Sequence, residues 1–290
     1  MFFRPPTSMK IRFAATCLLF SLLTGCTSLL VGPLVDPLNR SLQHQTDLDL
    51  VRDGTPTLLL ILDGLTDRYP TNSKLLLTAT QAYSSYAFTL DEMGESERAA
   101  TLSVKAKDYG LALFCQAADL QGTIPGQLED FKRILALFHK NNVPSLFWAG
   151  YGWATWIKMQ NGSPAALADL PKVEQIMLRV LELDETYYHG AAHIFLGYYY
   201  GSRPEILGGD MEKSRRHFER ALQINGRNYL MTQVTYAESY ARQTFNRELF
   251  DNLLTEVLNH PLTTDSDRST SNQLAKKRAR QLLAQIDDFF

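Results

Sequence analysis

Apolar residues recur with helical spacing along most of the chain. Leu58, Leu59 and Leu62 begin one apolar stripe that ends at Tyr69-Pro70, and similar stripes follow it. Glycine and proline separate the stripes, and no sustained alternation of apolar and polar residues indicates a strand. The sequence therefore predicts an all-α body. The expected helices cover approximately residues 55–69, 73–90, 96–118, 127–139, 145–159, 172–183, 189–200, 211–224, 228–242, 247–258 and 271–288.

Two of the expected helix pairs carry features of tetratricopeptide repeats. Residues 148–152 (Trp-x-x-Tyr-Gly) and 196–200 (Leu-Gly-x-x-Tyr) match the opening helix of such a repeat. Residues 218–221 (Phe-x-x-Ala) match the second helix, where small residues allow a close approach. We therefore expect a tetratricopeptide-like helix-pair solenoid, whose concave or tubular surface is suited to binding.

The first 25 residues have the pattern of a secretory leader. Basic residues precede an apolar run from Phe13 to Leu23, which is too short to span a bilayer. The ending Leu23-Thr24-Gly25-Cys26 resembles the lipobox of bacterial lipoproteins, in which the cysteine is acylated and becomes the first mature residue. We expect a signal peptide over residues 1–25, a linker over 26–47 anchored to the lipid membrane through Cys26, and a helical domain over 48–290.

Charge and candidate chemistry point away from nucleic acid and from catalysis. Without the leader, 26 basic residues face 31 acidic ones, a net charge of −5 that offers no footprint for nucleic acid. Cys115 lies in an apolar run, which favours a buried hydrophobic role over a nucleophile. His189 and His193 would share a helix face and form a structural pair rather than half of a zinc site. We expect no enzyme activity, cofactor or metal.

Aromatic residues concentrate in the middle of the chain. At helical spacing Trp148, Tyr151 and Trp156 share one face of a helix, flanked by Trp153. Tyr199 belongs to the next helix pair. Most of these rings are expected to pack helix interfaces. Trp153 and Tyr199 do not fit the same buried stripes as their neighbours, so we expect some rings to line a groove or channel with their polar ends in water.

A glycine-rich loop precedes one of the later helices. Gly208 and Gly209 should form the turn, and Asp210 should be the N-cap of the helix that follows. The loop adds residues to the expected repeat. The alternative is that the loop lines a ligand entrance, although its residue types favour the capping role.

Several segments, in order along the chain, together resemble one family. It is the T component, a tetratricopeptide-like lipoprotein that accompanies some tripartite ATP-independent periplasmic (TRAP) transporters. The segments that carry the resemblance are 56–60 with 69–72, 143–148 with Trp153 and Trp156, 203–204 with 207–210, 217–222 and 272–279. The resemblance implies a homotrimer of helical protomers, lipid-anchored in the periplasm and associated with a periplasmic solute-binding protein. It also implies a passage for an apolar or organic-acid ligand, and it supplies no catalytic residue.

The leading hypothesis is a non-enzymatic lipoprotein that docks a solute-binding protein and assists ligand delivery to a TRAP-type transporter. The residues that we place near the passage are Trp148, Tyr151, Trp153, Trp156, Tyr199, Gly208 and Gly209. The main alternative is a scaffold for envelope or outer-membrane assembly, and a helical enzyme is a third possibility. Thr27 follows Cys26 where an Asp would signal retention in the inner membrane of enteric bacteria, which favours the outer membrane.

Overall fold

The computed structural model describes residue 37 and residues 40–120, 123–262 and 266–290. All regular structure in these residues is helical, which confirms the all-α prediction for this part of the chain. The chain divides into two units, and the described fold is the second, Arg40–Phe290. The expected leader, Cys26 and most of the expected linker lie outside the described residues.

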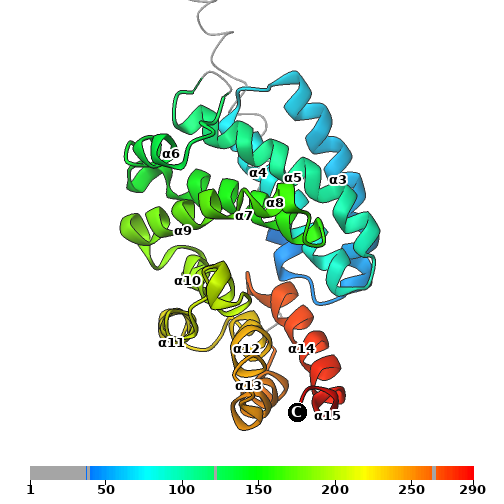
Figure 1. The fold of residues 1–290 in the computed structure, drawn as a ribbon. Coiled ribbons are helices and arrows are strands. Elements are labelled where there is room, and N and C mark those ends of the chain that lie inside the picture. Colours follow the sequence, from blue (N-terminus) through cyan, green and yellow to red (C-terminus); the bar gives the residue numbers. More distant parts are fainter. Residues whose placement is uncertain (1–36, 38–39, 121–122, 263–265) are drawn as a thin grey trace, which may run out of the picture. The chain divides into compact units, whose positions relative to one another are not determined.

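Consecutive helices pack against one another along the described unit (Figure 1). The most extensive packing joins α4 to α5, α5 to α7 and α10 to α11. Two short 3-10 helices, η1 (Lys140–Asn142) and η2 (Glu205–Leu207), and a π-helical segment, η3 (Ala237–Ala241), interrupt the series. The α-helices are α3 (Leu48–Arg68), α4 (Ser73–Glu92), α5 (Ser96–Ala117), α6 (Leu128–Leu135), α7 (Val143–Met159), α8 (Pro164–Leu167), α9 (Leu170–Asp184), α10 (Tyr187–Gly201), α11 (Met211–Asn225), α12 (Met231–Tyr236), α13 (Arg247–Asn259), α14 (Ser269–Ala284) and α15 (Ile286–Phe289).

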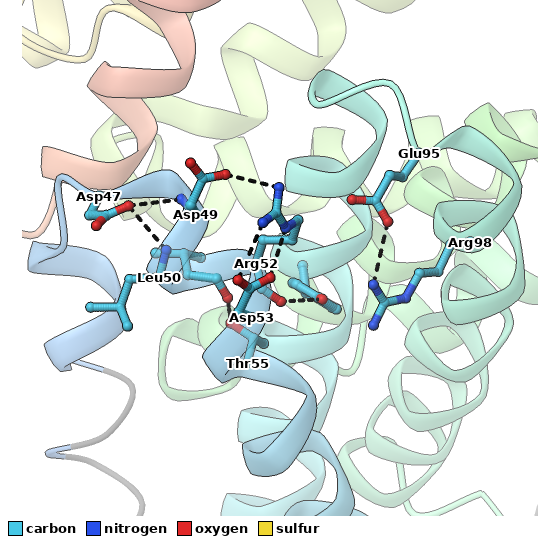
Figure 2. A network of polar contacts seen from close by, with 10 residues as sticks. Asp47, Asp49, Leu50, Arg52, Asp53, Thr55, Glu95 and Arg98 are labelled. Atoms are coloured by element: carbon cyan, nitrogen blue, oxygen red, sulfur yellow. Dashed lines mark hydrogen bonds and ion pairs between the residues drawn. The ribbon is translucent and has the colours of Figure 1, made fainter.

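Helix α3 begins earlier than its apolar stripe indicates, because polar groups cap its first turn. The Asp47 carboxylate accepts hydrogen bonds from the backbone N–H groups of Asp49 and Leu50, at 3.0 and 3.1 Å. Arg52 then pairs with Asp49 and with Asp53 (Figure 2). The cap satisfies N–H groups that the helix itself cannot satisfy.

A proline lies inside α3 without ending it. Pro56 has no N–H to donate to the carbonyl oxygen of Arg52, one turn earlier. The hydroxyl of Tyr86, on α4, donates to that oxygen at 2.6 Å. The neighbouring helix thus replaces the missing donor, and α3 continues through the proline to Arg68.

Two glycines allow neighbouring helices to approach closely. A Cβ atom at Gly152 of α7 would lie 2.5 Å from the carbonyl oxygen of Ala106 on α5. At Gly197 of α10 it would lie 2.8 Å from the ring of Phe218 on α11. Both glycines belong to the segments that match a tetratricopeptide pattern, so the contacts explain why a side chain is excluded there. The solenoid arrangement itself stays a prediction.

The C-terminal helices return to the first helices of the described unit. Helix α14 packs against α13 and also against α3 and α4 (Figure 1). The Thr270 hydroxyl lies 2.5 Å from the carbonyl oxygen of Leu42 and 2.6 Å from that of Gln45. The last part of the expected linker, 40–47, is therefore in contact with α14. The single helix expected over 271–288 is interrupted at Gln285, between α14 and α15.

Candidate functional site

The backbone makes a left-handed turn at the start of α10. Tyr188, His189 and Gly190 have φ angles of 47°, 63° and 75°. Glycine adopts this conformation freely, whereas each of the other two residues carries a cost of roughly 1–2 kcal/mol. Strained backbone of this kind gathers at functional sites, so the side chains that this turn displays are candidates for function.

An aromatic cluster surrounds the turn, and we define it as Phe147, Trp148, Tyr151, Tyr188 and Tyr229. The ring centre of Tyr188 lies 5.0 Å from that of Trp148 and 5.8 Å from that of Phe147. Tyr151 stacks on Phe147 at 5.8 Å and meets the edge of Trp148 at 5.4 Å. Tyr229 lies 6.5 Å from Tyr188. Offset and edge-to-face contacts of this kind stabilise aromatic pairs beyond the area that they bury.

The prediction that His189 pairs with His193 is wrong. The left-handed turn removes His189 from helical register, and its ring stacks on Tyr229 at 5.2 Å. Its Nε2 atom lies 3.4 Å from a carboxylate oxygen of Asp267. Burial lowers the pKa of His189 and outweighs the opposing effect of Asp267. His193 instead faces His217 on α11.

A charged network adjoins the aromatic cluster, and we define it as Asp91, Glu92, Lys158, Glu238 and Arg278. The ammonium of Lys158, on α7, lies 2.9 Å from Asp91 and 3.9 Å from Glu92, at the end of α4. The guanidinium of Arg278, on α14, lies 3.9 Å from Glu92 and 3.1 Å from Glu238. Glu238 belongs to the π-helical segment, a local irregularity that is common at functional sites. The charged network therefore brings together side chains from α4, α7, η3 and α14.

Lys158 is both surrounded by protein and open to water. Burial lowers its pKa, but Asp91 and Glu92 outweigh this effect, and the pKa lies above its ordinary value. Nevertheless 41% of its side-chain surface is accessible. The Lys158 ammonium therefore contacts two carboxylates while part of its side chain remains in contact with water.

The acidic members of the charged network differ in their protonation behaviour. Burial raises the pKa of Glu92, and the nearby cations do not fully offset that effect. Burial also raises the pKa of Asp91, but Lys158 outweighs it and leaves the pKa below its ordinary value. Burial raises the pKa of Tyr151, and the charge of Glu92 contributes in the same direction, so this ring borders the network.

The three tryptophans all lie on α7, as the sequence predicted, but each has different neighbours. Trp148 and Tyr151 lie in the aromatic cluster. Trp153 is buried, and its indole N–H donates to Asp169 at 2.9 Å. Trp156 lies under the ammonium of Lys107, 3.4 Å from the ring centre. Trp156 therefore belongs to the contact between α5 and α7, whereas Trp153 contacts the residue that precedes α9.

Tyr199 and the glycine loop form another group of contacts. Tyr199 is buried and donates its hydroxyl hydrogen to Glu174 at 2.9 Å, while the Arg203 guanidinium lies 3.4 Å above its ring. Gly208 has a φ of 84°, and a Cβ atom at Gly209 would overlap the carbonyl oxygen of Arg203. The two glycines form the expected turn.

Asp210 is the N-cap of α11, as the sequence predicted. Its carboxylate accepts a hydrogen bond from the backbone N–H of Lys213 at 2.9 Å. Its own N–H donates to the carbonyl oxygen of Tyr200 at 2.9 Å, which fastens the loop to α10.

Lys158, Glu92 and Arg278 were missed at the sequence level. One signal was available for Lys158. It follows Tyr151 by seven residues, so it falls on the same helical face as Trp148 and Tyr151. A lysine on a helix face that otherwise carries aromatic rings indicates that water reaches this part of the face. Glu92 and Arg278 are distant in sequence, and no local pattern places them there.

The described side chains include no metal-binding cluster and no activated thiol. No group of three or more histidine, cysteine or carboxylate residues among them could hold a metal ion. Burial raises the pKa of the Cys115 thiol, which disfavours the reactive thiolate. Within residues 40–120, 123–262 and 266–290, no helix is long and apolar enough to cross a membrane.

Comparisons with known proteins cover almost all of the described unit. The family model described as TRAP transporter T-component matches residues 44–290. An uncharacterized protein of Treponema pallidum (strain Nichols) is 28% identical over 273 residues, which span 87% of this chain and 83% of that protein.

Proposed function

The chain belongs to the T-component family of TRAP transporters, and from this premise we propose that it docks a solute-binding protein and assists delivery of its ligand to the transporter. Membership of this family supports association with a TRAP transporter. The partner, the passage and the anchor are parts of the proposal. We also propose that the helix pairs stack as a tetratricopeptide-like solenoid, which the close contacts at Gly152 and Gly197 favour.

The observation that carries the proposed passage is the accessible side chain of Lys158 beside Glu92, whose own side chain is 13% accessible. This ammonium and the rings of Trp148 and Tyr151 share one face of α7. An apolar portion of a ligand suits the rings, and an acidic group suits Lys158 or Arg278. The mixture of apolar surface with a few charges is typical of a small-ligand site.

Thiol labelling tests the passage directly. In a Cys115→Ala background, Lys158→Cys should react with a small thiosulfonate reagent but not with a bulky polymer maleimide. Leu137→Cys, on an exposed residue, should react with both reagents, and Val257→Cys, at a buried position remote from the proposed passage, with neither. Rapid reaction of Lys158→Cys with the bulky reagent would place this residue on the open surface and remove the support for a passage.

The loop before α11 supports a docking surface. Gly209 and the stacked Arg203 pack closely at the base of this loop, yet its side chains Ile206 and Leu207 are exposed, at 91% and 64%. Apolar side chains displayed by an ordered loop favour burial against another protein. We assign this position to the solute-binding protein.

A capture experiment tests the docking surface. The lipidated protein should retain a solute-binding protein from extracts of its own cell envelope, and Ile206→Glu with Leu207→Glu should abolish the capture. Leu137→Glu, at another exposed apolar position, is the matched control and should have no effect. Recovery of only barrel-assembly factors or peptidoglycan enzymes would instead favour an assembly scaffold.

We propose that acylated Cys26 holds the protein in the outer membrane, facing the periplasm, as a homotrimer. The sequence around Cys26 supports the anchor, and Thr27 supports the outer membrane. Cys26→Ser should release a folded body into the soluble fraction, and retention in the membrane would contradict the anchor. The molar mass of the detergent-solubilised protein distinguishes a trimer from a monomer.

A further inference from the structure

A pocket lies between α9, α10 and α11, and it shares no lining residue with the aromatic cluster or the charged network. Its volume is about 360 Å³. The lining residues are Leu178, His193, Tyr200, Lys213, Arg216 and His217. Four of these six residues carry basic groups, and Leu178 and the Tyr200 ring provide apolar surface. The inference that follows does not depend on the proposed function.

Two histidines in this pocket share one hydrogen bond. Their Nδ1 atoms lie 2.8 Å apart, so one nitrogen must donate and the other must accept. The Nε2 atom of His193 lies 3.3 Å from a carboxylate oxygen of Glu185, which places the His193 proton on Nε2. The Nδ1 atom of His193 is then the acceptor and the Nδ1–H of His217 is the donor. This arrangement leaves the Nε2 atom of His217 without a proton when the ring is neutral.

Both rings are neutral near pH 7. Burial lowers the pKa of His217 to about 4, and the positive charges of Arg216 and Lys213 act in the same direction. Burial also lowers the pKa of His193, in spite of Glu185. Burial, more than the neighbouring cations, therefore keeps His217 neutral, and a negative charge in the pocket would favour its protonated form.

The acidic groups around the pocket are already engaged. Glu185 accepts hydrogen bonds from Arg220 as well as from His193. Glu174, on α9, accepts from the hydroxyls of Tyr199 and Tyr200, at 2.9 and 2.6 Å. Asp210 caps α11 and lies 3.3 Å from the ammonium of Lys213.

Arg216 stands apart from the other guanidinium groups of its helix. Arg215 pairs with Glu212 and Glu219, and Arg220 pairs with Glu185. Arg216 forms no hydrogen bond or ion pair with any described residue, and it is exposed at the pocket. An unpaired guanidinium beside an ammonium and two histidines is a site for an oxyanion.

We propose that this pocket binds the carboxylate of a small organic acid, and that binding favours the protonated form of His217. The carboxylate pairs with Arg216 and Lys213. The Nε2 atom of His217 takes a proton from water and donates it in a hydrogen bond to the carboxylate, while its Nδ1–H continues to donate to His193. The pocket is larger than an inorganic oxyanion requires, and Leu178 and Tyr200 offer contact for an organic body, which favours an organic acid.

Calorimetry of the full chain tests the inference. Butanoate, benzoate and inorganic phosphate are titrated in two buffers of different ionisation enthalpy at about pH 7. Binding of the two carboxylates with net proton uptake is expected, and the uptake should be larger when the titrations are repeated at about pH 5.5. Inorganic phosphate should bind more weakly. Absence of carboxylate binding at millimolar concentration, tighter binding of phosphate, or binding without proton uptake would overturn the inference.

Variants of α11 locate the site. Arg216→Gln should weaken carboxylate binding by at least about tenfold, because it removes a charge-assisted contact. His217→Gln should remove the proton uptake while binding persists at lower affinity. Arg215→Gln, on the same helix but outside the pocket, is the matched control. Equal affinities of Arg216→Gln and Arg215→Gln, both shown to be folded by circular dichroism, would also overturn the inference.

Discussion

Lys158→Met should destabilise the fold although it removes a side chain that is 41% accessible. The ammonium lies 2.9 Å from Asp91, and two unit charges at that distance attract by about 6 kcal/mol at an effective dielectric constant near 20. The cost of desolvation and the access of water reduce the net value, so we expect a loss of about 2 kcal/mol. The loss arises because Asp91, Glu92 and Glu238 would retain only Arg278 as a positive neighbour.

The loss should also depend on pH. Without Lys158, the pKa of Glu92, already raised by burial, rises further. A carboxyl whose folded pKa is raised contributes stability below that pKa and loses it as pH rises through it. Lys158→Met should therefore be more destabilising at about pH 8 than at about pH 5.

Urea denaturation followed by circular dichroism measures this loss at both pH values. Lys132→Met is a matched control, because Lys132 is also 41% accessible and lies 2.8 Å from Glu129, but Glu129 is 78% accessible. Its removal should cost less than about 0.5 kcal/mol at either pH. Equal losses for the two variants, or a loss for Lys158→Met that ignores pH, would refute the reasoning.

Three further predictions follow from single residues. Gly152→Ala should lower the free energy of unfolding by about 1–3 kcal/mol in urea denaturation, because its Cβ would press on the Ala106 carbonyl oxygen and separate α5 from α7. Gly209→Ala should open the loop and speed its cleavage by protease, while far-ultraviolet circular dichroism stays unchanged, because the new Cβ would overlap Arg203. Acid should also weaken the fold. The folded pKa of His217 is about 4, so its contribution is present above pH 6.5 and is lost as pH falls toward 4. The loss is at most about 3 kcal/mol, and His217→Gln should reduce it in denaturation curves across that range.

Local signals in the sequence were sufficient to predict most helix positions. Asp210 and the glycines before it mark the start of α11, and the structure has the cap and the turn that these residue types favour. Pro56 was misleading, because a proline usually lies in the first turn of a helix. Tyr86, which lies on the next helix, supplies the missing donor. No pattern within α3 contains that information.

The basic residues of α14 show why the charged network was not predicted. By helical spacing Lys276 and Arg278 lie away from the apolar stripe, which is typical of solvated charges. In the structure Lys276 is 7% accessible and donates to the carbonyl oxygen of Leu258 at 2.8 Å. Arg278 reaches Glu238 and Glu92. Because α14 packs on α13 and also against α3 and α4, part of its polar face is buried. Such packing depends on contacts that are remote in sequence.

The left-handed turn at Tyr188 links strain, packing and the candidate site. Gly190 is the only residue of the three whose type favours positive φ, so the sequence predicted a helix that begins at residue 189, inside the turn. The cost of holding Tyr188 and His189 there must be offset by the contacts that the turn creates. In these contacts the Tyr188 ring packs against Trp148, and the His189 ring packs against Tyr229. A regular helix from residue 187 would turn both rings toward other neighbours. The turn therefore positions the aromatic cluster beside Lys158, and the proposed passage depends on it.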